Sequence, residues 1–302
     1  MTEPKGPAEA VTGLVERSAA AYVSAVPGHP QDDGFFGPAS VTWRITGDLS
    51  APVAGLRSLL MQALHPLAMA GVDQHSDWRR DPVGRLAATS AYEATVTYGD
   101  RASATRVAQR VRAIHTRVQG VDTVTGQPYT ASDPALLLWV HAALVDSALA
   151  ASTLFGTPLA GADADAYVGE MRIAAELLGV AREIIPANVA GLERYIADVR
   201  PVLRGTPAAA ESMGYLLDPA GLDPDIADLW QDIRDAAIAA LPGWARQEYG
   251  YPAPAPVTAE RRTEIRQALG VLDAVFLAEP GVLEARQRLV LRMRSAARVA
   301  GG

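Results

Sequence analysis

The chain has 302 residues, of which 49% are hydrophobic and 20% are charged. This composition is sufficient for a buried core and too apolar for a disordered chain. The sequence contains no cysteine, which excludes disulfides, zinc–thiolate and iron–sulfur sites, thiolate-ligated haem and a cysteine nucleophile. Lys5 is the single lysine, so we expect neither a Schiff base nor a P-loop lysine. The net charge of −7 argues against non-specific binding to nucleic acid.

Helical spacing of apolar residues recurs along most of the chain and predicts an all-α protein. The predicted helices are residues 8–24, 56–69, 82–99, 100–119, 135–155, 163–178, 187–203, 207–216, 224–241, 258–278 and 280–299. Pro82 fits the first position of one helix, and Asp100 is the expected cap of the next. Alternation typical of a strand is scarce, and residues 40–45 are the best candidate.

These elements predict a single multi-helix globular domain of roughly ten or more helices around a buried apolar central helix. Within it we expect an N-terminal helix and connector over residues 1–37, a core over 38–205 and a C-terminal helical extension over 206–302 that packs on the core.

Residues 135–155 form the most apolar segment and are long enough to cross a bilayer. His141 and Asp146 lie near its middle, and an aspartate at the centre of a membrane helix costs about 2.5–3.5 kcal/mol. We therefore interpret the segment as the buried central helix of a soluble protein and expect no integral membrane insertion. The N-terminal residues have no apolar segment behind a basic one, so we expect no secretory signal and a cytoplasmic location.

Sequence motifs of several common enzyme classes are absent. The chain has no G-x-G-x-x-G after a strand, no Walker sequence, no H-E-x-x-H and no G-x-S-x-G. The Glu-x-x-His pairs of di-iron helical bundles are also missing, because no histidine stands three residues after Glu93, Glu170 or Glu176. Redox chemistry in such a protein then points to an organic or haem cofactor.

Five histidines remain as candidate ligands, and four of them have simple structural explanations. His29 lies in the connector, where we expect it to be solvated. His65 ends an apolar helix, where its imidazole can instead meet the free carbonyls of that helix. His75 and Asp77 resemble the His-x-Asp pair of mononuclear non-haem iron oxygenases, but such a pair can also cap the following helix. His141 lies inside the apolar segment, where burial demands a hydrogen-bond partner.

The fifth histidine, His115, lies on the apolar stripe of the helix predicted over residues 100–119, and five arginines surround the other sides of that helix. A neutral imidazole nitrogen ligates haem iron, an apolar slot holds the porphyrin, and arginines neutralise its propionates. The pattern therefore suits a haem site. A hydrogen-bonded core histidine is the structural alternative.

Several segments match a known family in order and with ordinary spacing. They are residues 59–66, 71–76, 81–85, 98–99, 111–115, 133–134 and 139–141, together with Thr89, Gly120, Tyr129, Glu170, Gly179 and Pro186. Over about residues 38–200 the chain resembles the catalytic domain of the MpaB/rubber oxygenase family, many of whose bacterial members are uncharacterised. The resemblance implies that the core over 38–205 is an oxygenase-like, haem-binding unit.

This resemblance implies an all-helical protein that binds haem b and cleaves carbon–carbon double bonds of an apolar, isoprenoid-like or lipid-like substrate with dioxygen. His115 matches the proximal histidine that ligates the haem iron. Arg85 and Thr89 match the Arg-x-x-x-Thr pair that lines the haem pocket, where they are expected to hold a propionate or stabilise charge on oxygen. Some rubber oxygenases have a lysine just before this threonine, able to ligate the iron. Ala88 stands there in this chain, which implies a distal side open to water, dioxygen or substrate.

Further residues are expected in the same site. His65, His141 and Arg112 are predicted to contact the cofactor. The acidic residue proposed as a base in the latex-clearing branch has no convincing match, and Asp73 and Asp77 are the nearest candidates.

Two other functions remain open from the sequence. One is a haem-free helical binding or interaction protein in which His65, His115 and His141 only satisfy polar groups of the core. The other is a mononuclear non-haem iron oxygenase that uses His75, Asp77 and a further histidine.

Overall fold

The computed structural model describes residues 8–26, 32–76, 79, 82–218, 224–251 and 257–300. Within these ranges it contains fourteen α-helices, two short 3-10 helices and one two-stranded hairpin, which confirms the all-α prediction. The helices are α1 (Ala8–Ala25), α2 (Val41–Thr46), α3 (Ala51–Gln62), α4 (Pro66–His75), α5 (Pro82–Tyr98), α6 (Arg101–His115), α7 (Pro134–Phe155), α8 (Gly161–Leu178), α9 (Val189–Val199), α10 (Pro207–Leu217), α11 (Pro224–Ala240), α12 (Gly243–Glu248), α13 (Ala259–Ala278) and α14 (Val282–Ala300). The 3-10 helices are η1 (Arg182–Ile184) and η2 (Arg200–Val202).

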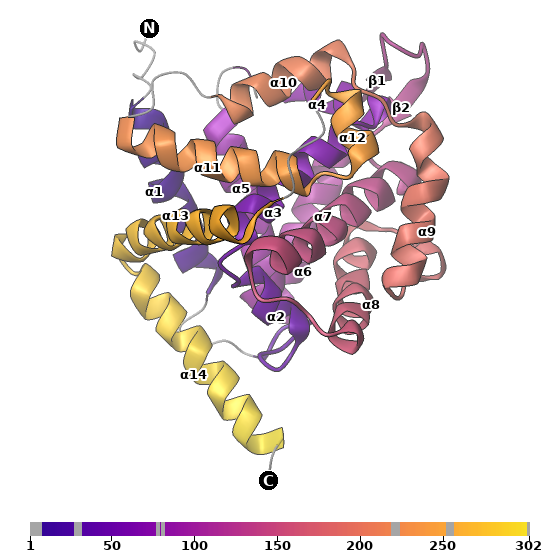
Figure 1. The fold of residues 1–302 in the computed structure, drawn as a ribbon. Coiled ribbons are helices and arrows are strands. Elements are labelled where there is room, and N and C mark those ends of the chain that lie inside the picture. The colour runs from indigo at the N-terminus through magenta and orange to yellow at the C-terminus, as the bar shows by residue number, and fades with distance from the viewer. Residues whose placement is uncertain are drawn as a thin grey trace, which may run out of the picture.

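Helix α7 runs through the middle of the molecule and organises the packing (Figure 1). It contacts three helices that precede it in the chain, α2, α3 and α4, and four that follow it, α8, α9, α11 and α13. Its Trp139 and Phe155 are fully buried together with Leu60 of α3, Ile233 of α11 and Leu269 of α13. Although α7 is long and apolar enough to cross a membrane, 67% of its most apolar window is buried inside the protein. The prediction of a buried central helix is therefore confirmed.

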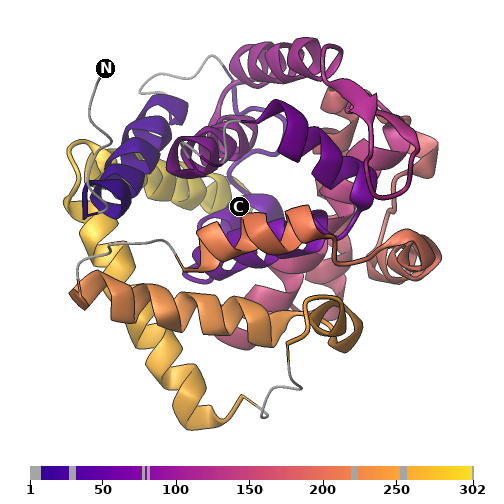
Figure 2. The ribbon, with the colours of Figure 1, turned by 90° about the horizontal axis from the view of Figure 1, so that it is seen from above.

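The N-terminal helices form a second packed region beside this core. Figure 2 shows α1 and α5 side by side, and α6 packs against α5. The ring of Trp43 in α2 meets the ring of Tyr98 in α5 edge to face at 5.2 Å between centroids. Arg292 of α14 lies 4.7 Å above the same Trp43 ring, which ties the C-terminal helix to this region.

The prediction of one helix over residues 56–69 is wrong, because the chain breaks between α3 and α4. Helix α3 ends at Gln62, and α4 begins at Pro66. Proline has no N–H to donate and disfavours a helical conformation of the residue before it. His65 accordingly has an extended backbone, with ψ at 112°, and becomes the residue that precedes α4.

The prediction of a strand over residues 40–45 is also wrong, because this segment forms α2. Ser40 caps the helix by accepting a hydrogen bond from the Trp43 N–H at 3.2 Å. Glu170 of α8 accepts the N–H groups of Val41 and Thr42 at 3.2 and 2.8 Å. Tertiary contacts thus override a local pattern of β-branched residues that is typical of strands.

A short hairpin was not predicted. Strands β1 (Gln119–Val121) and β2 (Pro128–Thr130) pair antiparallel, and they follow α6, which ends at His115 instead of continuing to residue 119. The Tyr129 hydroxyl donates to Gln74 Oε1 of α4 at 2.8 Å. A Cβ atom at Gly120 would lie 2.7 Å from that same oxygen and 2.9 Å from the Tyr129 hydroxyl, so a larger residue there would require these side chains to shift.

Candidate functional site

Helix α6 places His115 at its last position. The Asp100 side chain caps the helix by accepting from the Ser103 N–H at 2.7 Å, as predicted from the sequence. Ala104 and Ala108 are buried, whereas the His115 side chain is half-buried. Burial lowers the pKa of the His115 imidazole, and among the described residues its ring nitrogens have no hydrogen-bond partner. The imidazole is thus held in the neutral form that ligates metals.

Arg85 and Thr89 lie on α5, which packs against α6. They are four residues apart and therefore share one face of the helix. The Thr89 side chain is exposed, and the side chain of Arg85 lies outside the described part of the chain. The structure thus brings together the two helices that carry the three residues matched to the haem pocket.

His65 and His141 are both buried, with 9% of each residue exposed. Burial lowers the pKa of His65 and lowers that of His141 to about 4, so both imidazoles are neutral at pH 7. The Nδ1 atom of His65 is buried without a hydrogen-bond partner. No partner for the His141 ring occurs among the described residues either. An unpaired polar group in a core costs about 1–3 kcal/mol, so these imidazoles suit a site that a bound group completes.

Arg112 of α6 is the remaining predicted cofactor residue. It is exposed, and its guanidinium lies beside the C-terminal end of α8. Gly179 closes α8 in a left-handed conformation, with φ at 101°, and a Cβ atom there would lie 3.7 Å from the Arg112 guanidinium carbon. A cation at this place interacts favourably with the negative, C-terminal end of the α8 dipole. Arg112 therefore has a structural contact in addition to its predicted role.

His75, the basis of the non-haem iron alternative, is exposed at the end of α4. One of its ring nitrogens, Nε2, forms a hydrogen bond with the Gln119 carbonyl oxygen at 3.0 Å, and its ring meets Tyr129 edge to face. Asp77 lies outside the described residues. No group of three potential metal ligands converges within the described ranges. The geometry thus gives His75 a structural role in holding the hairpin on α4.

The sequence did not single out three enclosed polar groups. Glu93 and Tyr92 lie on α5, and Tyr167 lies on α8. Burial raises the pKa of the Glu93 carboxyl to about 7. The available signal in the sequence was that Glu93 is the one charged residue between positions 90 and 99. Its raised pKa depends on burial by the folded chain and cannot be read from the sequence.

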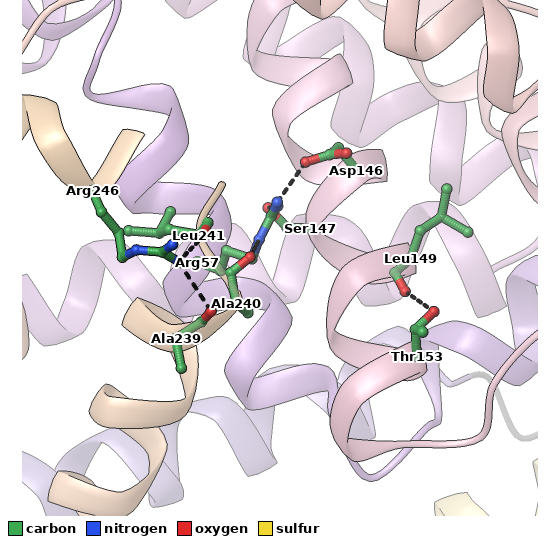
Figure 3. A network of polar contacts seen from close by, with 9 residues as sticks. All are labelled: Arg57, Asp146, Ser147, Leu149, Thr153, Ala239, Ala240, Leu241 and Arg246. Carbon is green, nitrogen blue, oxygen red and sulfur yellow. Dashed lines mark hydrogen bonds and ion pairs between the residues drawn. The ribbon is translucent and has the colours of Figure 1, made fainter. Parts of the chain in front are cut away.

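An ion pair in the core explains how α7 carries an aspartate. The Arg57 guanidinium donates to Asp146 Oδ2 at 2.7 Å, to Ser147 Oγ at 2.6 Å and to the Ala240 carbonyl at 2.9 Å (Figure 3). A cleft of about 310 Å³ lies beside this pair, with Trp244 on one wall. None of the predicted cofactor residues lines this cleft.

The fold and these residues define an all-helical protein with neutral histidines and unpaired polar groups among its helices. Residues 43–274 match the family model described as "ER-bound oxygenase mpaB/B'/Rubber oxygenase, catalytic domain". The chain therefore belongs to this oxygenase family, as the sequence motifs predicted.

A solved structure, described as "Structure of Latex Clearing Protein LCP in the closed state", has a similar fold. The TM-score is 0.51 at 18% sequence identity, and the alignment covers 91% of this chain and 77% of that chain. At this identity the likeness bears on the fold alone. None of the curated proteins compared with the chain matches it.

Proposed function

We propose that the chain is a haem b-dependent oxygenase that acts on an apolar, isoprenoid-like or lipid-like substrate and cleaves a carbon–carbon double bond. Membership of the oxygenase family supports the reaction class. The observation that carries the haem assignment is the state of His115. Its imidazole is half-buried, is kept neutral by burial and has no hydrogen-bond partner among the described residues, at the position that the family motif gives to the iron ligand.

The residues proposed for the site fit a haem on chemical grounds. Arg85 is the cation that would pair with a haem propionate, and Thr89 would offer its hydroxyl as a hydrogen-bond donor in the same pocket. His65, His141 and Arg112 are proposed as further contacts. Ala88 stands where some rubber oxygenases have a lysine, so this position would offer no ligand to the haem.

Bound haem supplies an iron centre that activates dioxygen. The protein contributes a neutral imidazole at His115 and a hydroxyl donor at Thr89 that stabilises negative charge as it develops on oxygen. The reaction balances without another oxidant, because both atoms of one dioxygen end in the two carbonyl groups made from the cleaved double bond.

Isotopically labelled dioxygen tests this proposal. We expect the haem-loaded protein to convert an isoprenoid into two carbonyl fragments that each carry one labelled oxygen, as detected by mass spectrometry. Thr89→Ala should lower kcat by about 10–100-fold, and Thr89→Ser should retain most of the rate. Haem-loaded protein that produces no labelled carbonyl from a panel of isoprenoids and unsaturated lipids would overturn the proposal.

A further inference from the structure

The cleft beside the Arg57–Asp146 ion pair is a candidate for a second ligand site. Its volume is about 310 Å³, and α3, α7, α9 and α12 contribute to its walls. Small-molecule sites in proteins begin at about this size. Met61 is fully buried and the Arg57 side chain is 4% exposed, so these residues of α3 mark the closed end. Glu193 and Arg200 are exposed and mark the mouth. The cleft therefore runs from solvent to the ion pair in the core.

One face of α9 lines the cleft. Its residues follow the three- and four-residue spacing of a single helix face and are Glu193, Ile196, Ala197 and Arg200. They place two apolar side chains between two opposite charges. The Arg200 guanidinium carbon lies 5.6 Å from the centre of the Trp244 ring in α12, within the range of a cation–π contact. Among the described residues no cation pairs with the Glu193 carboxylate, which is therefore available to a ligand.

The closed end of the cleft offers a hydrogen-bond acceptor. The Arg57 guanidinium already donates to the Ala240 carbonyl, to Ser147 Oγ and to Asp146 Oδ2 (Figure 3). One oxygen of Asp146 is thus used, and no described residue donates to the other, Oδ1. The Asp146 side chain is 28% exposed and lines the cleft. A donor group of a ligand can therefore bond to Asp146, whereas Arg57 is turned to acceptors of the protein.

These groups select the charge of a ligand. An anion would be repelled by the carboxylates of Asp146 and Glu193, and the donors of Arg57 that could hold it are engaged. An uncharged apolar ligand would cover Asp146 Oδ1 without giving it a donor, which is unfavourable. A cation with N–H groups is attracted by both carboxylates, and an apolar body attached to it can pack on Ile196 and on the Trp244 ring.

We propose that the cleft binds a small organic cation, an ammonium or guanidinium group on a short aromatic or aliphatic body. The cationic nitrogen donates a charge-assisted hydrogen bond to Asp146 Oδ1, and Glu193 at the mouth adds attraction. Arg200 carries the same charge as the ligand and therefore weakens its binding. None of the residues proposed for the haem lines the cleft, so the inference goes beyond the oxygenase function and can fail independently of it.

Three probes of similar shape test the charge preference: phenethylamine, the uncharged 2-phenylethanol and the anion 3-phenylpropanoate. Isothermal titration calorimetry of the purified chain at pH 7 and low salt measures their affinities. We expect the amine to bind at least about 10-fold more tightly than the alcohol, which corresponds to about 1.4 kcal/mol. The anion should show no saturable binding, and added salt should weaken binding of the amine.

Variants at the mouth test the sign of each charge. Glu193→Gln should weaken binding of the amine about 2–5-fold, and Arg200→Gln should strengthen it by a similar factor. The matched controls are Asp198→Asn and Arg194→Gln, which change the charge by the same amounts at exposed positions of α9 outside the cleft. Both controls should leave the affinity nearly unchanged, because water and salt screen charges at these positions.

A variant at the closed end tests the acceptor. Asp146→Asn removes the charge and should reduce the affinity of the amine to that of the alcohol. Circular dichroism checks that this variant folds, since it also weakens the ion pair with Arg57. The variants at Glu193 and Arg200 change exposed side chains and are sufficient to decide the inference by themselves.

An NMR signal locates the bound amine. The chain has five tryptophans, and the indole N–H signal that disappears in Trp244→Phe belongs to Trp244. This signal should shift in the parent chain as the amine saturates its site. Four results would overturn the inference: no saturable binding of the amine, equal or tighter binding of the other probes, weaker binding of the amine in Arg200→Gln, or saturation without a shift at Trp244.

Discussion

The Arg57 guanidinium of α3 lies 2.7 Å from the Asp146 carboxylate of α7, and this contact links the two helices at the centre of the fold (Figure 3). The side chain of Arg57 is 4% exposed, whereas that of Asp146 is 28% exposed. Removing the carboxylate therefore leaves a buried cation without its counter-charge. The pair explains how α7, a mostly apolar and largely buried helix, carries an aspartate.

Asp146→Ala should lower the free energy of unfolding by about 3 kcal/mol, because the buried guanidinium loses its ionic partner. Urea denaturation followed by tryptophan fluorescence measures this change. The matched control is Arg44→Ala, which breaks an equally short pair with Asp163 in which both side chains are more than 40% exposed. It should cost less than about 1 kcal/mol. Similar losses in the two variants would show that burial of Arg57 has no special importance.

A pair of glycines provides a test of local packing. A Cβ atom at Gly156, just after α7, would lie 1.9 Å from Asp48 Oδ1 and 2.6 Å from Ser50 Oγ. Asp48 cannot move freely, since its carboxylate accepts hydrogen bonds from the Ser50 and Thr157 N–H groups. Gly156→Ala should therefore lower the melting temperature and cost about 1–3 kcal/mol. Gly55→Ala in α3, where nothing lies within 4 Å of the added atom, should stabilise by about 0.5–1 kcal/mol. In calorimetry the melting temperature should fall for Gly156→Ala and rise for Gly55→Ala. A change in the same direction for both variants would contradict the packing described.

The cap that α8 provides for α2 is the subject of a third prediction. Glu170→Ala removes the acceptor of three hydrogen bonds from Val41 and Thr42, at 3.2, 2.8 and 2.7 Å. We expect a loss of about 1–3 kcal/mol in unfolding free energy and faster amide exchange at the start of α2. Glu176→Ala, which breaks the exposed pair with Arg182, is the control and should cost less than about 1 kcal/mol. Unchanged exchange in α2 after loss of Glu170 would argue against the cap.

Two enclosed groups make opposite contributions to the pH dependence of stability. The pKa of Glu93 is raised from 4.5 to about 7, so the folded protein keeps a proton that the unfolded chain loses in this interval. The free energy of unfolding therefore falls as pH rises, by roughly 3 kcal/mol. The pKa of His141 is lowered from 6.5 to about 4, so there the unfolded chain binds the extra proton. Its contribution rises with pH by a similar amount between about pH 4 and 6.5, and the lowered pKa values of His65 and His115 add to it.

Single variants separate these opposing contributions. Glu93→Gln should steepen the rise of stability between pH 4 and 7 and should be more stable than the parent chain at pH 8. His141→Gln should flatten or invert the rise. Chemical denaturation at several pH values measures both slopes, and parallel curves for the three proteins would contradict the enclosed state of these side chains.

The local signals of the sequence predicted most of the helices. Pro82 favours the start of α5 through its fixed backbone angle, and Asp100 caps α6 through a hydrogen bond within the first turn. Both effects are local, so the sequence alone is sufficient to identify them. Pro66 carried the same kind of information: His65 was expected to end a helix, but the helical segment was still drawn to residue 69 and the start of α4 at Pro66 was missed. The family motifs identified His115 as the proposed iron ligand, and the match over residues 43–274 confirmed the family resemblance itself.

Other features depend on contacts distant in the sequence. The segment that forms α2 looked like a strand because its cap, Glu170, is 128 residues away from Thr42. The partner that compensates Asp146 lies on another helix, 89 residues earlier. Glu93 is an ordinary residue in the sequence, and the raised pKa of its carboxyl appears only when the folded chain buries it. Burial of polar groups is a tertiary property, which no local pattern encodes.

Visible absorption of the purified chain, titrated with haemin, tests the central claim most directly. We expect the parent protein to take up haem with an intense Soret band, and His115→Gly to lose that band and regain it on addition of imidazole. His75→Ala should retain the band, because His75 only holds Gln119. A parent protein that takes up no haem, or a Soret band unchanged in His115→Gly, would contradict the account.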